Sequence, residues 1–198
     1  MSTAPALDPD LLALIRDVPD FPSPGVVFKD IGPLLRDPQA YAAVLRALTD
    51  TVGEQLQRGG GRDREGAAGE RGFDVVVGIE ARGFLLGAPL ALAAGVGFVP
   101  VRKAGKLPGD TLFASYSMEY GQATVEVQRD AIRDGDRVLV VDDVLATGGT
   151  VGAALDLVRR AGGTPVAVAV LIELGFLHGA AALRSAGYRG PLVSLQLV

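Results

Sequence analysis

The sequence contains no cysteine and only one histidine, His178. Without cysteine the chain can form neither a disulfide nor a thiolate metal site, which suits a reducing compartment such as the cytoplasm. A single histidine cannot form the histidine cluster of many zinc sites, so His178 is expected at the surface or at a helix end. The composition therefore gives no sign of a metal held directly by these side chains.

An excess of positive charge is also missing, since the formal net charge is −4. No global positive field would attract nucleic acid, and an anionic substrate has to be held by local donors. The acidic segment MSTAPALDPD lacks the basic n-region of a signal peptide. The uncharged stretch Gly83 to Val101 contains Pro89 and Pro100, which favours helix, turn and strand over a membrane span. A cytoplasmic protein with small-molecule partners, and with no nucleic acid or membrane partner, is expected.

Two common nucleotide-binding motifs are absent as well. Lys106 is followed by leucine rather than Ser or Thr, so there is no Walker A motif. Gly95 and Gly97 are not followed by the third glycine of GxGxxG. A phospho-receiver domain carries paired aspartates at the end of its first strand, whereas here the pair comes late in the chain.

What is present is the stretch VLVVDDVLATGGT, Val138 to Thr150. Its aliphatic run Val138 to Val141 predicts a strand buried on both faces of a parallel sheet. The run stops at two adjacent carboxylates, Asp142 and Asp143. A short link then leads to Thr-Gly-Gly-Thr and to a helical pattern of apolar residues. The predicted order is strand, acidic pair, Gly/Thr turn and helix N-terminus.

Each part of this stretch has a chemical use. Glycines let backbone N–H groups approach a ligand closely, and a helix N-terminus presents unpaired N–H groups at the positive end of a dipole. Thr147 and Thr150 add hydroxyl donors. Together they predict a cup for one phosphate monoester, beside carboxylates that accept hydrogen bonds from vicinal sugar hydroxyls. That combination predicts a site for a 5-phosphoribosyl group.

The rest of the chain predicts one α/β domain, in which strands alternate with helices around a mostly parallel sheet. Asp8-Pro9 and Asp37-Pro38 are helix-start signals, the first for a short amphipathic helix through Ile15. The other predicted strands are Phe73 to Ile79, Val96 to Val101, Ala123 to Gln128 in a hairpin arm, Pro165 to Ile172, and an alternating edge strand Leu192 to Leu197. A short helix is predicted over Gly179 to Ser185.

Three segments keep alternative interpretations. Residues 21–35 are irregular but apolar, and a lid over the core is favoured over a pocket wall. Arg82 follows a strand that ends in Glu80, and a place in the ligand crevice is favoured over a surface salt bridge. Residues 102–122 are rich in Arg, Lys, Tyr and Glu, which favours a loop that closes on an anionic ligand over a solvated hairpin. Residues 59–72 predict a flexible surface insertion with no chemistry.

The stretch Val138 to Thr150 resembles the phosphoribosyl pyrophosphate (PRPP) motif of the type I phosphoribosyltransferase family. Three further segments, PGVVFKDIGPLL, GIEARGF and VRKAGKLPGDTLFASYSMEYG, resemble its adenine-specific members. The resemblance implies a mostly parallel central sheet flanked by helices, a flexible catalytic loop, and a small N-terminal hood formed by residues 1–36. It also implies transfer of the 5-phosphoribosyl group of PRPP to N9 of adenine, Mg²⁺ held mainly by PRPP with no direct protein ligand, and a homodimer.

The resemblance also implies roles for individual residues. The catalytic residues would be Glu119, Asp142, Asp143 and Arg82. The 5′-phosphate would contact Ala146, Thr147, Gly148, Gly149 and Thr150, and pyrophosphate would contact Arg82, Arg102, Lys103 and Lys106. The adenine pocket would comprise Val27, Phe28, Lys29 and Leu145, and the closing loop would carry Tyr116 and Tyr120. Many members of the family have arginine where this chain has Lys29, so no role that needs a guanidinium is carried over there.

Two alternatives belong to other classes. A regulator of this fold could bind PRPP and control transcription, but such proteins carry an added basic DNA-binding segment, and this chain is acidic. A related enzyme could instead take a 6-oxopurine or orotate, although the PGVVFKDI segment argues against it.

Overall fold

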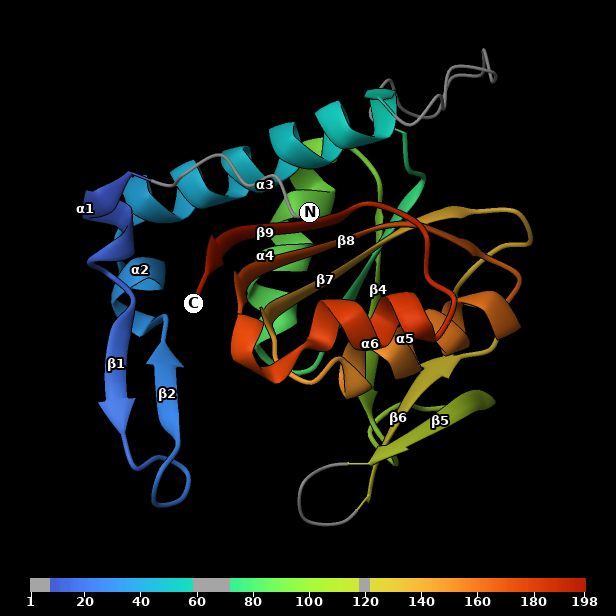
Figure 1. Cartoon of the computed structure of the whole chain (residues 1–198). Helices are drawn as coiled ribbons and strands as arrows, with labels where there is room; N and C mark the ends of the chain where they lie inside the picture. The colour runs from blue at the N-terminus through green and yellow to red at the C-terminus, as the bar shows by residue number, and fades with distance from the viewer. Residues whose placement is uncertain (1–7, 59–71, 118–121) are drawn as a thin grey trace.

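The computed structural model of the chain describes residues 8–58, 72–117 and 122–198, and its centre is a seven-stranded sheet (Figure 1). The strand order is β5-β6-β4-β3-β7-β8-β9, and the pairs among the last five strands are parallel. The strands are β3 (Val75–Ile79), β4 (Gly97–Lys103), β5 (Thr111–Ser117), β6 (Gln122–Gln128), β7 (Arg137–Leu145), β8 (Thr164–Glu173) and β9 (Leu192–Leu197). The predicted mostly parallel α/β architecture is confirmed.

Helices cover both faces of the sheet (Figure 1). The helices α3 (Pro38–Arg58) and α4 (Arg82–Ala94) lie on one face, and α5 (Gly149–Arg160) and α6 (Gly179–Ser185) lie on the other. Alternate residues of β7 therefore enter different cores: Val138 and Val140 pack on the α5 side, and Leu139 and Val141 on the α3 and α4 side. This explains why the aliphatic run of β7 is continuous rather than alternating.

The strand β7 is longer than the sequence predicts. It continues through both aspartates to Leu145, because β8 supplies ladder partners along that length, with Asp142 opposite Val170 and Leu145 opposite Glu173. The expectation that the strand ends before the acidic pair is therefore wrong. The two carboxylates are held by the sheet ladder rather than by a loop.

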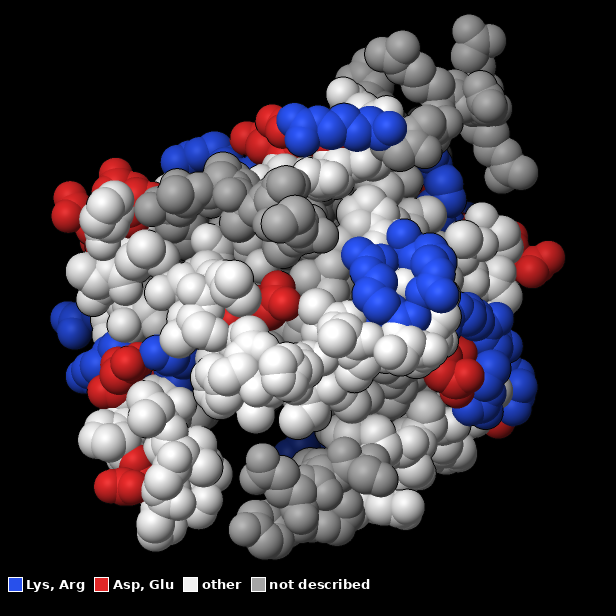
Figure 2. Space-filling model, viewed as in Figure 1, with Lys and Arg blue, Asp and Glu red and all other residues white. Residues whose placement is uncertain are grey.

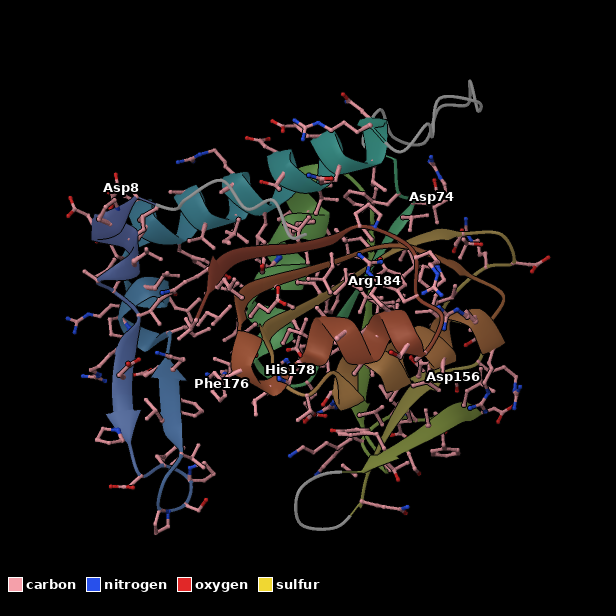
Figure 3. The ribbon with its side chains drawn as sticks, in the orientation of Figure 1. Asp8, Asp74, Asp156, Phe176, His178 and Arg184 are labelled. Carbon is pink, nitrogen blue, oxygen red and sulfur yellow. The ribbon has the colours of Figure 1, made fainter. Side chains whose placement is uncertain are left out.

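The two edges of the parallel sheet carry different side chains. At the amino edge Arg137 forms an ion pair with Asp74, which Figure 3 labels (Nη2 to Oδ1, 2.7 Å). The backbone N–H of Arg137 also donates to Asp74. The Asp74 N–H in turn donates to the Arg137 carbonyl, so these contacts fix β3 against β7. The carboxyl edge carries the acidic pair.

The N-terminal segment forms a separate two-stranded antiparallel sheet of β1 (Arg16–Pro19) and β2 (Val27–Asp30), which stands apart from the main sheet (Figure 1). Asp8 caps α1 (Pro9–Leu12) as predicted, but the helix ends before Leu14 and Ile15 because the chain turns into β1. A short helix, α2 (Gly32–Arg36), follows β2. The expected core lid over residues 21–35 is confirmed only for its second half: Ile31 and Leu34 are buried in the core, whereas Phe21 and Val27 are about half exposed, at 51% and 50%.

The remaining predictions concern the start of α3, the bounds of α6 and the burial pattern of β9. Asp37 caps α3 through the N–H groups of Gln39 and Ala40, and α6 has its predicted bounds. β9 lies at the sheet edge, but Leu192 to Leu195 are all buried, so the predicted alternation is absent. None of the helices in the described part of the chain is both long and apolar enough to cross a membrane.

The basic segment is a hairpin arm rather than one long loop. Arg102 and Lys103 lie in β4, and Tyr116 lies in β5, because β5 pairs with β6 along its whole length. The expectation of one long loop is therefore wrong for these three residues, and the hairpin alternative is observed. Glu119, Tyr120 and residues 59–71 lie outside the described residues.

Candidate functional site

The turn from β7 into α5 forms the predicted cup. Gly148 occupies the N-cap position with a positive φ of 87°, and no side chain caps the helix. The first-turn N–H groups of α5 therefore have no side-chain acceptor, which is the condition for binding an anion. Thr147 is exposed and Gly148 is buried, so the cup opens to solvent on its threonine side.

The start of α6 supports this cup through two glycines in direct contact. A Cβ on Gly148 would lie 2.9 Å from the Gly179 carbonyl oxygen, and a Cβ on Gly179 would lie 2.2 Å from the Ala146 carbonyl oxygen. The sequence reasoning missed Gly179, because its partners lie about thirty residues earlier in the chain. The adjacent His178 is exposed at the N-cap of α6, as the helix-end expectation requires (Figure 3).

The two aspartates are buried carboxylates at the carboxyl edge of β7. Asp142 is 8% exposed and Asp143 is 6% exposed. Burial, with the charge of Asp143 beside it, raises the pKa of Asp142 well above its ordinary value, although the Asp143 N–H donates to Asp142 Oδ1 at 2.9 Å. Burial also raises the pKa of Asp143, while Arg82 opposes that rise. Such groups favour a ligand that brings hydrogen-bond donors.

Arg82 joins the aspartates to the N-terminal hairpin. Its Nη2 lies 2.8 Å from Asp143 Oδ2, which accepts no aligned hydrogen bond from the described residues, so the contact is an ion pair alone. Its Nη1 donates to the Lys29 carbonyl at 2.9 Å, and its guanidinium lies 4.4 Å from the centre of the Phe28 ring. Arg82 therefore pairs with a buried carboxylate at the carboxyl edge of the sheet, rather than forming a surface salt bridge.

The predicted base pocket is only partly assembled by the hairpin. The Phe28 ring is half-buried and meets Phe21 edge to face at 5.1 Å, and Val27 is exposed. Figure 2 shows a hollow between this hairpin and the body of the molecule. The Lys29 ammonium is already paired with Asp17 at 2.7 Å.

Leu145, predicted for the same pocket, is fully buried in the core on the α5 side. Its side chain faces other core residues, because it lies inside the β7 ladder rather than after it. Its backbone is also engaged, since the Leu145 carbonyl accepts a hydrogen bond from the Leu174 N–H at 2.9 Å.

The predicted pyrophosphate cations gather beside the end of β3. Arg102 Nε lies 3.3 Å from Glu80 Oε2, and the Lys103 N–H donates to the same oxygen at 2.9 Å. That backbone hydrogen bond holds the pKa of Glu80 below its usual value, against the effect of burial and with help from Arg102. The side chains of Lys103 and Lys106 are exposed.

A groove of about 510 Å³ begins at the phosphate cup and runs between β5, α5 and α6. Tyr116 and Thr147 line it, whereas the acidic pair and Arg82 do not. The groove therefore adjoins the acidic edge without containing it. Asp156, labelled in Figure 3, lines it from α5.

The comparisons with known proteins agree on one family. The model of a phosphoribosyl transferase domain matches residues 62–185. An adenine phosphoribosyltransferase of Streptomyces coelicolor is 57% identical over 95% of this chain and 94% of its own length. One from Nocardioides sp. is 58% identical over 91% of this chain and 90% of its own.

Solved structures give the same result. The adenine phosphoribosyltransferase of Saccharomyces cerevisiae, complexed with an imino-altritol bisphosphate and adenine, superposes with a TM-score of 0.81 at 38% identity, covering 94% of this chain and 96% of that one. The enzyme of Giardia lamblia complexed with 9-deazaadenine has a TM-score of 0.81 at 40% identity, with 96% of each chain covered.

Replacement of Gly179 by alanine should weaken the cup. The new Cβ would lie 2.2 Å from the Ala146 carbonyl, so the cup must shift. We expect binding of ribose 5-phosphate, measured by calorimetry, to weaken about tenfold, which corresponds to about 1.4 kcal/mol. Gly152→Ala is the control, because its Cβ would meet only Leu183 at an ordinary 3.6 Å. Wild-type affinity in Gly179→Ala would contradict this role.

Replacement of Asp142 by asparagine should stabilise the ligand-free protein at neutral pH. The folded-state pKa is raised, so the contribution of Asp142 to stability is fully present below about pH 3.8 and is lost as pH rises through that raised value. Asparagine avoids this loss and can still accept from the Asp143 N–H. Thermal unfolding between pH 5 and 8 should show the advantage growing with pH, whereas the exposed control Asp156→Asn should show none. A variant less stable than wild type at pH 7 would refute the expectation.

Proposed function

Because this chain belongs to the adenine phosphoribosyltransferase family, we propose that it transfers the 5-phosphoribosyl group of PRPP to N9 of adenine, giving AMP and pyrophosphate. The observation that carries the proposal is the position of Arg82. It connects the buried acidic pair, which adjoins an uncapped helix N-terminus, to the aromatic ring of the hairpin. Sugar, phosphate and base sites are thereby adjacent.

Binding of PRPP follows from the two ends of this arrangement. The N–H groups at the start of α5, with the hydroxyls of Thr147 and Thr150, donate to the 5′-phosphate. Asp142 and Asp143 accept hydrogen bonds from the ribose hydroxyls, each charge-assisted bond contributing about 1.5–3 kcal/mol. These donors compensate the burial that raises both pKa values, so binding the sugar favours the charged form of the pair.

The reaction forms the bond from N9 to C1′ and breaks the bond from C1′ to the pyrophosphate oxygen. The transition state has oxocarbenium character, as at other anomeric centres, and its positive charge develops beside the acidic pair. Negative charge on the leaving pyrophosphate is met by Arg102, Lys103 and Lys106. Phe28 stacks on the base, and Glu119 remains the candidate for accepting the N9 proton.

Mg²⁺ belongs to the proposal as an ion held mainly by PRPP. The acidic pair offers carboxylate oxygens, and Asp143 Oδ2 accepts no hydrogen bond within the described residues. These negative groups fit beside a Mg²⁺ that is held by the PRPP oxygens, without serving as its direct ligands. The ion would add positive charge to the leaving group, while the residues above position the sugar and the base.

A homodimer and a cytoplasmic location are also part of the proposal. The dimer is supported by α4, where Leu85 and Leu92 are 45% and 82% exposed and lie on one face of the helix. Sedimentation equilibrium should give twice the chain mass of 20.4 kDa, and Leu92→Glu should shift it towards the monomer. A wild-type monomer at micromolar concentration would rule the dimer out.

The alternatives are tested by a panel of bases. Adenine should support PRPP-dependent pyrophosphate release with a kcat/KM at least on the order of 100-fold above hypoxanthine, guanine, xanthine and orotate, and omission of Mg²⁺ should suppress it. Faster turnover of another base would overturn the adenine assignment. Binding of PRPP without pyrophosphate release for any base would favour the regulator, although the matched relatives above bear the names of enzymes.

A further inference from the structure

Glu126 is a buried carboxylate outside the residues assigned to the reaction. It lies in β6, opposite Arg102 of β4, and is 2% exposed. Its Oε1 accepts hydrogen bonds from the N–H groups of Lys106 at 2.7 Å and Leu107 at 2.8 Å. Burial alone would raise the pKa of Glu126, but these N–H groups hold it below its usual value.

The partners of Glu126 are unusual for a buried charge. Within the described residues no Lys or Arg side chain forms an ion pair with it, so backbone N–H groups compensate its burial. Gly105 has a φ of +80°, and successive N–H groups after such a residue form a concave anion site. The carboxylate therefore holds the turn that carries Lys106.

The carbonyl of Lys106 is fixed from the other side. It accepts a hydrogen bond from Arg102 Nη1 at 3.0 Å, and Arg102 is itself held by Glu80. The N–H and the carbonyl of Lys106 are thus both bound by charged side chains of neighbouring strands. In contrast, the Lys106 ammonium is exposed and enters no ion pair within the described part of the chain. The backbone of Lys106 is therefore fixed, while its ammonium group remains available to an anionic ligand.

We propose that Glu126 is a positioning residue, which fixes the Lys106 backbone so that the Lys106 ammonium meets the pyrophosphate of PRPP. The inference rests on the proposed function and adds a residue to it. Glu126 acts through Lys106 and does not touch the substrate. A residue that only stabilised the turn would affect unfolding without affecting anion binding.

The test is Glu126→Gln, because glutamine keeps the shape but removes the charge and places an NH₂ group near the backbone donors. We expect the Kd of magnesium pyrophosphate, measured by calorimetry, and the KM for PRPP to rise about five- to tenfold, with the KM for adenine unchanged. The salt dependence of pyrophosphate binding should also decrease, because one cation contributes less. Glu173→Gln is the matched control, since Glu173 is also buried but accepts a hydrogen bond from the Ser194 hydroxyl.

A double-mutant cycle with Lys106→Ala shows whether Glu126 acts on pyrophosphate binding through Lys106 or independently of it. Lys106→Ala alone should weaken pyrophosphate binding, and Glu126→Gln should add less than about twofold in that background. Independent, multiplicative effects would overturn the inference, as would a destabilised Glu126→Gln with wild-type affinity or a Lys106→Ala variant with wild-type affinity. The base panel judges the proposed function separately, because pyrophosphate binding is measured without adenine.

Discussion

The parallel pairing of β3 with β7 is the constraint on which the rest of the site depends. Both strands end at the same edge of the sheet, so the turn after β3 delivers Arg82 beside the aspartates of β7. The start of α4 approaches so closely that a Cβ on Gly83 would lie 2.8 Å from the Val141 carbonyl. A slip of this register by one residue would turn the carboxylates towards the opposite face, and the ion pair could not form.

The two edges of the parallel sheet have different roles: contacts at the amino edge stabilise the fold, and groups at the carboxyl edge are available to a ligand. At the amino edge Asp74 and Arg137 satisfy each other and hold the strands together. At the carboxyl edge Arg82 pairs with Asp143 and the Asp143 N–H donates to Asp142, but burial still raises the pKa of both carboxyl groups. Their burial costs stability until a ligand supplies donors, so ligand binding is coupled to the relief of that cost. The long ladder of β7 with β8 is what keeps these carboxylates in place.

Features with a local signal were predictable from the sequence. The buried strands, the Asp caps of α1 and α3, and the acidic pair before the glycine turn each depend on neighbours in the chain. The pairing of β1 with β2, the contact of Gly179 with Ala146 and the bonds of Glu80 and Glu126 to the basic turn depend on distant residues. No spacing pattern in the sequence predicts these contacts, because the residues are far apart in the chain and meet only when the strands are paired. For the same reason the sequence predicts a loop for Tyr116 and a pocket for Leu145, whereas the ladders place both residues in strands.

The separation of the two edges also bears on how this protein can change over evolution. The chain between Arg58, the end of α3, and Val75, the start of β3, joins the sheet at the amino edge. The Gly-rich residues 59–72 belong to that connection. The connection meets β3 at its amino end, whereas Arg82 and the aspartates lie at the carboxyl edge of the sheet. An insertion or deletion in that connection is therefore expected to leave Arg82 and the aspartates in place. The turns after β3 and β7 instead carry Arg82 and the phosphate cup, so a change of length there would displace ligand-binding groups.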